Sequence, residues 1–363
     1  MPRVRVAILG ASGLVSQRMQ QRLSNHPWFE LIAVAGQSAG IGLRDLTWHL
    51  DQQRPDFIER SSILVTDINS ETLANELSQL GVKIVFSALP SEPALRIEKN
   101  LVEAGLNVFS NASAYRMNPD VPLVVADVNP DALVQTSPNK GMHACSTNCT
   151  LIPVLHPLSL LHQRYEIESV VVRSEQALSG AGWKLLHNPE EKANAIGNEI
   201  DGEAGKIIEE AEKILNLSGV SWDVQCKRID EQDGHLVHVV VHLQDSPTYS
   251  EVVATLSASQ VHKPLPSQPE YSMQLIDTEP DRNQHLWNGQ TLEEVQPSND
   301  LSAGMTTTVQ LQSVEDGTVV FRALSHNTIR GAAGGVVLLA ELALFNNMLA
   351  SVDINPSSSS SES

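Results

Sequence analysis

Cysteine is scarce in this chain, and the few that occur cannot form a disulfide framework. Only three cysteines are present among 363 residues, too few and oddly numbered for a stapled secreted fold. Two of them, Cys145 and Cys149, stand four residues apart in GMHACSTNCTLIPVLHPL (141–158), and Cys226 follows far along the chain. We therefore expect a reducing compartment. We expect no metal site, because a single Cys-x3-Cys pair lacks the second pair of a zinc-binding pattern.

Basic residues are also few. Lys and Arg total 24 against 43 Asp and Glu, which gives a formal net charge of −19. No run of Lys and Arg forms a basic patch, and this excludes nucleic acid and anionic membrane surfaces as partners. A small anionic ligand stays compatible with the sequence, because a few well-placed cations are enough to bind it.

Long apolar segments are missing as well. No stretch reaches the roughly 18 apolar residues that a membrane span needs, and MPRVRVAILG has no apolar core of signal-peptide length. The apolar fraction of 41% and charged fraction of 18% are ordinary for a soluble globular protein. We expect a cytosolic protein with two domains, because a chain of this length can bury two cores.

Strands and helices alternate in the first part of the chain. Short apolar runs predict strands at VRVAIL, ELIAVAG, SILVT, VKIVFSALP, LNVFSN and LVVADVNP, and helical patterns cover 14–24, 71–80 and 93–104. This alternation predicts a doubly wound parallel sheet of the Rossmann type over residues 1–145. We expect the final helical segment, 327–352, to complete this domain.

The texture changes after the cysteine pair. Longer and often alternating runs, namely IESVVVRSEQAL, WDVQCKRI, HLVHVVVHL, EVVATLSAS and GTVVFRAL, predict a mainly antiparallel sheet. We assign residues 146–326 to an α+β catalytic and dimerisation domain. The serine-rich segment 353–363 is of low complexity and is expected to be disordered.

A glycine-bearing turn follows the first strand. In VAILGASGLVSQRM, Gly10 and Gly13 stand between a strand and a helix, where free backbone N–H groups bind a pyrophosphate. The third glycine of the usual pattern is Ser16, so a plain tight turn is the alternative. The second strand ends without the acidic residue that binds the ribose of NAD. Ser38 stands near that point and is a candidate to bind a 2′-phosphate, so we favour NADP over NAD.

Either cysteine of the pair is a candidate nucleophile. Pro153 fits only the first turn of a helix, so we expect the helix to begin near residue 149 or 150, with Asn148 as its cap. A helix N-terminus stabilises a thiolate, which favours Cys149 over Cys145. The alternative is that both are small buried hydrophobic residues, as most free cysteines are.

Five motifs together resemble the aspartate-semialdehyde dehydrogenase family, in particular its archaeal and fungal branch. These motifs are STNCT, EQALSGAG, RIDEQDGH, NASAYRMNPDVPLVVADVNP and SHNTIRGAAGG, and the similarity extends from AILGASG to LLAEL. The resemblance implies NADPH-dependent reduction of 4-aspartyl phosphate to aspartate 4-semialdehyde, in a homodimer or homotetramer. It also selects Cys149 as the nucleophile.

The resemblance assigns roles to residues that their surroundings leave open. His235, at the start of an expected strand, becomes the acid/base, whereas His238 and His242 lie about 13 Å apart along that strand and cannot share a metal ion. Gln176 orients the acyl group. The substrate-binding residues implied are Arg116, Asn148, Glu203, Lys206 and Arg228, with the two arginines binding the substrate phosphate and α-carboxylate and Glu203 the α-ammonium group. The dinucleotide-binding residues expected are Gly10, Ala11, Ser12, Gly13, Leu14, Val15, Ser38, Ser87, Pro90, Ser179, Gly180 and Asn327.

Two other kinds of protein stay compatible with these residues. A related acyl reductase would use the same cysteine and histidine on an acyl-CoA or on N-acetylglutamyl phosphate, and would have little use for Glu203. A catalytically silent dinucleotide-binding regulator is the non-enzyme alternative. It is disfavoured because Cys149, His235, Arg116 and Arg228 are all present.

Overall fold

The computed structural model describes residues 3–134, 140–258 and 263–349. The expected serine-rich tail lies outside these residues, as does the end of the expected C-terminal segment. Within them, no helix is both long enough and apolar enough to cross a membrane.

A parallel sheet of six strands forms the first part of the molecule, as predicted. Its order is β3-β2-β1-β4-β5-β6, and every neighbouring pair is parallel. The strands are β1 (Val4–Leu9), β2 (Phe29–Gly36), β3 (Val65–Asp67), β4 (Ile84–Ser87), β5 (Asn107–Ser110) and β6 (His143–Cys145). The helices of this part are α1 (Leu14–Leu23), α2 (Asp56–Glu59), α3 (Leu73–Gln79) and α4 (Ser91–Glu103). Strand order changes direction at β1, and open α/β sheets bind their ligands outside the carboxyl ends of the strands at such a point.

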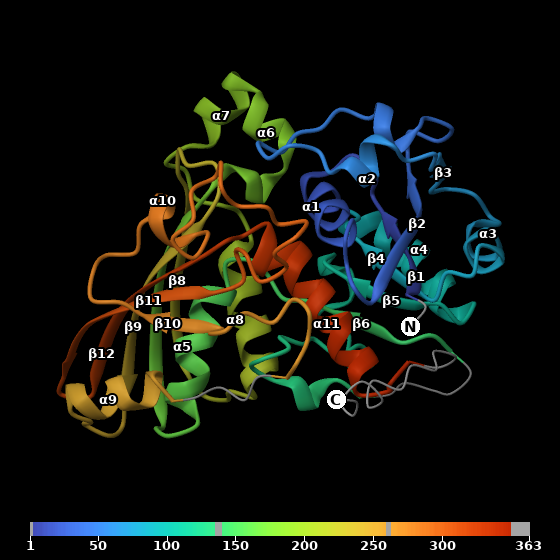
Figure 1. Ribbon diagram of the computed structural model, residues 1–363. Coiled ribbons are helices and arrows are strands. Elements are labelled where there is room, and N and C mark those ends of the chain that lie inside the picture. The colour runs from blue at the N-terminus through green and yellow to red at the C-terminus, as the bar shows by residue number, and fades with distance from the viewer. Residues whose placement is uncertain (1–2, 135–139, 259–262, 350–363) are drawn as a thin grey trace, which may run out of the picture.

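The last helix of the chain packs on this first sheet. Helix α11 (Gly334–Phe345) is apolar on all sides apart from the buried Glu341, and its residues share one core cluster with Val6, Ile8 and Phe86 of the sheet. In Figure 1, α11 is drawn in red and the first sheet in blue to green, because they are far apart in the sequence, yet the helix lies beside the sheet. A helix with apolar residues on all sides is buried, which explains its central place.

The second sheet is mixed and mostly antiparallel. Its order is β10-β11-β12-β9-β7-β8; the β11–β12, β12–β9 and β7–β9 pairs are antiparallel, and the two outer pairs are parallel. The strands are β7 (Ile167–Gln176), β8 (Ser221–Arg228), β9 (His235–Leu243), β10 (Met273–Leu275), β11 (Thr307–Glu315) and β12 (Thr318–Ser325). The helices around it are α5 (Ile152–His162), α6 (Trp183–His187), α7 (Pro189–Ala195), α8 (Glu203–Leu215), α9 (Tyr249–Leu256) and α10 (Arg282–His285).

Two expected strands are wrong. EVVATLSAS forms helix α9 over most of its described residues, because Thr248 and Glu251 make a reciprocal capping box that starts a helix there. LVVADVNP makes only an isolated bridge from Leu123 to Cys145. The side chain of Asn129 accepts from the Val125 amide at 2.8 Å and donates to the Leu123 carbonyl at 3.0 Å, which closes this segment into a turn.

Candidate active site

Cys149 and His235 meet where the two sheets adjoin. Cys149 lies in the turn between β6 and α5, and His235 is the first residue of β9. The Cys149 Sγ is 3.3 Å from the His235 Nε2. Two glycines allow this approach, since a Cβ on Gly331 would lie 2.6 Å from the Cys149 Cβ, and one on Gly180 would lie 3.0 Å from the His235 Cε1. The pair predicted from sequence is therefore brought together.

The expected helix start at residue 149 or 150 is wrong. Helix α5 begins at Ile152, with Pro153 in its first turn and no side-chain cap. Residues before it form a turn, in which the Leu151 amide donates to the Asn148 carbonyl at 3.1 Å. The Asn148 Oδ1 instead accepts from the Thr150 amide at 2.7 Å. Cys149 thus precedes the helix by one turn.

Both members of the pair are neutral at physiological pH. Burial, together with the Glu203 carboxylate, raises the pKa of Cys149 to about 11, against the lowering expected from a helix start. Burial, together with the Arg228 guanidinium, lowers the pKa of His235 to about 3. The Ala177 amide donates to the His235 Nδ1 at 3.1 Å. A neutral imidazole accepting at Nδ1 carries its hydrogen on Nε2, so His235 presents a donor to the sulfur.

Cys145 lies in different surroundings. It ends β6, is fully buried and belongs to the apolar core around α5. Burial and the Glu98 carboxylate raise the pKa of its thiol well above the usual range. This is the environment of an unreactive core cysteine.

Helix α8 carries a row of charged residues toward this region. Glu203 accepts from the Asn148 Nδ2 at 2.8 Å, and its other oxygen lies 3.6 Å from the half-exposed Lys206 Nζ. Two turns after Glu203, the Glu210 carboxylate accepts from the Asn148 amide at 2.7 Å and from the Thr147 hydroxyl at 2.8 Å. Glu210 was missed by sequence reasoning, although it follows Glu203 by seven residues and so shares its helix face.

Arg116 is held by the same carboxylate. Its Nη1 donates to the Glu210 Oε1 at 3.0 Å and its Nη2 to the Asn111 carbonyl at 2.7 Å. Its Nε is buried and has no partner among the described residues. The guanidinium is thus fixed, while its Nε–H is left for an anion.

Gln176 and Arg228 end two neighbouring parallel strands and lie opposite each other. The Gln176 Nε2 is 3.5 Å from the Glu203 Oε1, and the Arg228 Nη1 donates to the Ala177 carbonyl at 2.7 Å. Both side chains are buried. Carboxylate, amide and guanidinium groups therefore lie around the Cys149–His235 pair.

The glycine turn fits a close approach of a dinucleotide. Gly10 has a φ of +99°, and a Cβ there would lie 3.0 Å from the Ala88 carbonyl oxygen. Gly13 precedes α1, whose N-terminus has no side-chain cap, so its first amides are free for a phosphate. At the end of β4 the buried Ser87 hydroxyl has no partner within the described part of the chain, while Pro90 is exposed. Ser38 is half-buried after β2.

The residues expected at the nicotinamide ring lie close to the cysteine–histidine pair. Ser179 and Asn327 are buried, and the Asn327 Nδ2 donates to the Ser179 hydroxyl at 2.8 Å. Gly180 follows Ser179 and lies against His235. Leu14, at the start of α1, and Ser179 line the same small pocket, so the residues expected at the two ends of the dinucleotide lie in adjoining parts of the structure.

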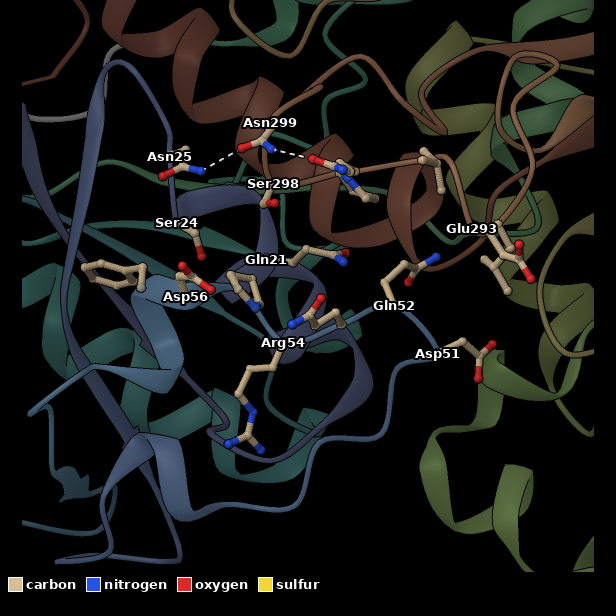
Figure 2. A pocket seen from close by; sticks show the side chains of 17 residues that line it. Gln21, Ser24, Asn25, Asp51, Gln52, Arg54, Asp56, Glu293, Ser298 and Asn299 are labelled. Carbon is tan, nitrogen blue, oxygen red and sulfur yellow. Dashed lines mark hydrogen bonds between the residues drawn. The ribbon is translucent and has the colours of Figure 1, made fainter.

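A cavity of about 610 Å³ lies elsewhere, between the end of α1, residues 51–57 and residues 292–299. Figure 2 shows its polar lining, with Gln21, Gln52 and Glu293 among the labelled side chains. None of the predicted site residues lines it. The cavity is therefore separate from the cysteine–histidine pair.

Buried neutral histidines make a prediction about acid stability. The pKa of His326 is lowered to about 3, mainly by burial, like that of His235, and burial also lowers the pKa of His156. The unfolded chain protonates these histidines below about pH 6.5, whereas in the folded chain His235 and His326 stay neutral until about pH 3. Stability is thus complete above pH 6.5 and falls as pH drops, by about 1.4 kcal/mol per pH unit for each of His235 and His326.

Urea titrations at pH 7.0, 6.0 and 5.0 measure this loss. His326→Phe should reduce the slope of unfolding free energy against pH, because neither ring nitrogen of His326 has a partner in the described residues and an apolar ring removes one titrating group. An unfolding free energy that is constant from pH 7 to 5 would contradict the assignment.

The comparisons with known proteins agree with this geometry. Residues 5–136 match the family model described as semialdehyde dehydrogenase, NAD binding domain. Aspartate-semialdehyde dehydrogenase of Archaeoglobus fulgidus is 33% identical over 94% of this chain and 98% of its own length. The crystal structure of aspartate semialdehyde dehydrogenase with NADP from Candida albicans is 28% identical, with a TM-score of 0.78, over 96% of this chain and 100% of that one. Malonyl CoA reductase (NADP) of Metallosphaera sedula is 28% identical over 93% of this chain and 96% of its own length.

Fold and sequence together define an oxidoreductase of the semialdehyde dehydrogenase class, with a Rossmann-type domain and a second, mixed-sheet domain. Within that class, the chain belongs to the aspartate-semialdehyde dehydrogenase family.

Proposed function

We propose that the protein catalyses the reversible NADPH-dependent reduction of L-4-aspartyl phosphate to L-aspartate 4-semialdehyde and phosphate, a step in the synthesis of lysine, threonine and methionine. The observation that carries this proposal is the 3.3 Å approach of Cys149 and His235 between an acidic residue, Glu203, and a buried guanidinium, Arg228. This set suits an acyl substrate that also bears an ammonium and a carboxylate group.

NADP is the proposed dinucleotide. The turn from Gly10 to Val15 would hold its pyrophosphate, Ser38 its 2′-phosphate, and Ser87, Ser179 and Asn327 its nicotinamide side. The Candida albicans relative was crystallised with NADP. When bound, the reduced form supplies the hydride that an acyl group needs to become an aldehyde.

The chain's own residues provide covalent catalysis in this proposal. The Cys149 sulfur attacks the acyl carbon, the new C–S bond replaces the bond to phosphate, and the thiol proton leaves with the phosphate. Arg116 and Lys206 bind the departing group. The thioester is more electrophilic than a carboxylate, so one difficult step becomes two easier ones. Gln176 orients the acyl group.

His235 is the proposed acid/base. Its Nε2–H points at the sulfur and stabilises the thiolate whenever the C–S bond breaks. A bound phosphate dianion raises the pKa of a nearby imidazole, so substrate binding brings His235 closer to its working range.

An assay with the purified protein tests the function. We expect NADP to be reduced in the presence of aspartate semialdehyde and phosphate, with a higher kcat/KM than NAD. The absence of phosphate-dependent turnover would contradict the proposal. Turnover of malonyl-CoA or N-acetylglutamate semialdehyde in its place would assign one of the related acyl reductase activities.

Glu203→Gln is expected to reduce kcat/KM for aspartate semialdehyde by roughly tenfold to a hundredfold, because a charge-assisted contact contributes about 1.5–3 kcal/mol. Succinate semialdehyde, which lacks the amino group, should be affected little. Steady-state kinetics with both substrates measure the difference. Glu209→Gln, an exposed carboxylate on the same helix, is the matched control, and an equal loss on both substrates would show that Glu203 does not bind the ammonium group.

We also propose that two copies pair through the open face of the second sheet. Val171, Val240 and Val320 lie side by side on β7, β9 and β12 and remain partly exposed. Residues of both signs flank them, such as Arg173 and Glu175, so the face can complement a copy of itself.

Val240→Asp is expected to convert the dimer into a monomer of 39.5 kDa, because pairing would bury an aspartate carboxylate without a partner in each copy. Sedimentation velocity distinguishes the two masses. Val134→Asp, at an exposed valine of the first domain, should leave the mass unchanged. A monomeric wild-type protein would rule the pairing out.

A further inference from the structure

Asp233 has no part in the proposed reaction, yet its carboxylate is bound from three segments of the chain. Its Oδ1 accepts from the Ser179 hydroxyl at 2.6 Å and lies 3.4 Å from the Thr328 Oγ1. Its Oδ2 lies 3.4 Å from the Nη2 of Arg18, a buried residue of α1. Burial alone would raise the pKa of Asp233, but nearby His326 and Arg18 and the Ser179 hydroxyl lower it. Asp233 is therefore ionised and can only accept hydrogen bonds.

This acceptor determines the direction of the Ser179 hydroxyl. A serine hydroxyl has one hydrogen, and in Ser179 that hydrogen points to Asp233. The Asn327 Nδ2 donates to the same oxygen at 2.8 Å. Ser179 consequently has no hydrogen left for a ligand and offers only an acceptor.

Asn327 is oriented in the complementary sense. Its Oδ1 accepts from the Gly234 amide at 2.8 Å, and because a backbone amide can only donate, the amide nitrogen of Asn327 faces Ser179. One N–H of that nitrogen is used by Ser179, and the second remains a donor. Ser179 and Asn327 thus present an acceptor beside a donor, the pattern that matches the N–H and C=O of a primary carboxamide.

We propose that Asp233 is a positioning residue that fixes this proton arrangement, so that Ser179 and Asn327 accept a dinucleotide bearing a nicotinamide carboxamide and reject one bearing a carboxylate. The inference rests on the proposed function, which places these two residues at the nicotinamide. Their position supports it, because the neighbouring Gly180 touches His235 and thus lies at the reacting centre. The buried Arg18 extends the same contact to the helix that follows the glycine turn.

Calorimetric titration of the full-length protein with NADP and with nicotinic acid adenine dinucleotide phosphate tests the inference by binding alone. We expect the wild-type protein to prefer NADP by roughly 10- to 100-fold, because a carboxylate has no hydrogen for Ser179 and is repelled by Asp233. In Asp233→Asn the new amide can donate to Ser179 and release its hydrogen. The preference should then fall to a few-fold or less, mainly through tighter binding of the carboxylate analogue relative to NADP.

Asp230→Asn is the matched control. This carboxylate stands three residues earlier in the same loop and is largely exposed, where it pairs with Lys192 at 2.6 Å. It removes the same charge without touching Ser179, so its preference should equal that of the wild type. Because Asp233→Asn leaves Arg18 buried without its counter-ion, the double variant Arg18→Met/Asp233→Asn is measured as well and should show the same reduced preference.

The outcomes separate the inference from the function on which it rests. A wild-type protein that binds neither dinucleotide contradicts the proposed function. A wild-type protein that binds both equally, or Asp233 variants that keep the wild-type preference, overturn the role of Asp233. An equal reduction in Asp230→Asn would assign the effect to general charge and would overturn it too.

Discussion

Replacing Cys149 with serine is expected to abolish turnover, by a factor on the order of 10⁴ or more. A hydroxyl is a far weaker acid than a thiol, and the neutral His235 beside it presents a hydrogen rather than a lone pair, so nothing at the site activates the serine. The substituted oxygen is smaller than sulfur, so the fold should be preserved. Initial rates of NADP reduction, together with NADP binding by calorimetry, measure the change.

Cys145→Ser is the control for this result. It makes the same chemical change four residues earlier, at a fully buried position in the core around α5. We expect it to retain most of the activity while lowering thermal stability, because a hydroxyl is buried there without an assigned partner. A dead Cys145→Ser enzyme beside an active Cys149→Ser enzyme would reverse the assignment of the nucleophile.

His235→Ala is expected to lower kcat by roughly 10²- to 10⁴-fold, the usual contribution of a positioned acid or base. The physical reason is the loss of the Nε2–H donor that lies 3.3 Å from the sulfur. The effect on the first chemical step, formation of the thioester, is measured by following phosphate release in the presteady state. An unchanged kcat would move the role to another residue.

His235→Gln separates the two things that a histidine can do here. The glutamine amide donates a hydrogen bond as Nε2–H does, but it does not act as an acid or a base near neutral pH. Activity close to that of wild type would show that hydrogen bonding to the sulfur is the main contribution of His235. Activity close to that of the alanine variant would show that proton transfer is required.

Much of the architecture followed from local patterns in the sequence. Buried parallel strands are continuous apolar runs, and for this reason β1, β2, β4 and β5 were predicted close to their observed positions. The two strands that were wrongly expected have local causes that the apolar pattern alone does not reveal. In one, a capping box made α9 a helix; in the other, the Asn129 side chain took the backbone bonds of an expected strand.

The residues around Cys149 could be predicted from the sequence only in part. Glu203 and Arg228 could be, because they stand in recognisable motifs. Glu210 was missed because a charged residue on an amphipathic helix is normally solvated, and only folding places it against Asn148 and Arg116. In the sequence, Asp233 stands within the motif RIDEQDGH with no role of its own, although the fold surrounds it with Ser179 and Arg18.

By itself, the sequence determined the two kinds of sheet and the glycine turn, because these depend on the periodicity and identity of neighbouring residues. The proposal of Cys149 as the nucleophile rests on its motif and on the family resemblance. Only the tertiary structure decided the protonation of the site. The raised pKa of Cys149 and the lowered pKa of His235 come first from burial and then from Glu203 and Arg228, which are distant in sequence. The direction of the hydrogen on His235 is set by the amide of Ala177, 58 residues before it. Such properties depend on distances between groups that only folding brings together, and no local pattern encodes them.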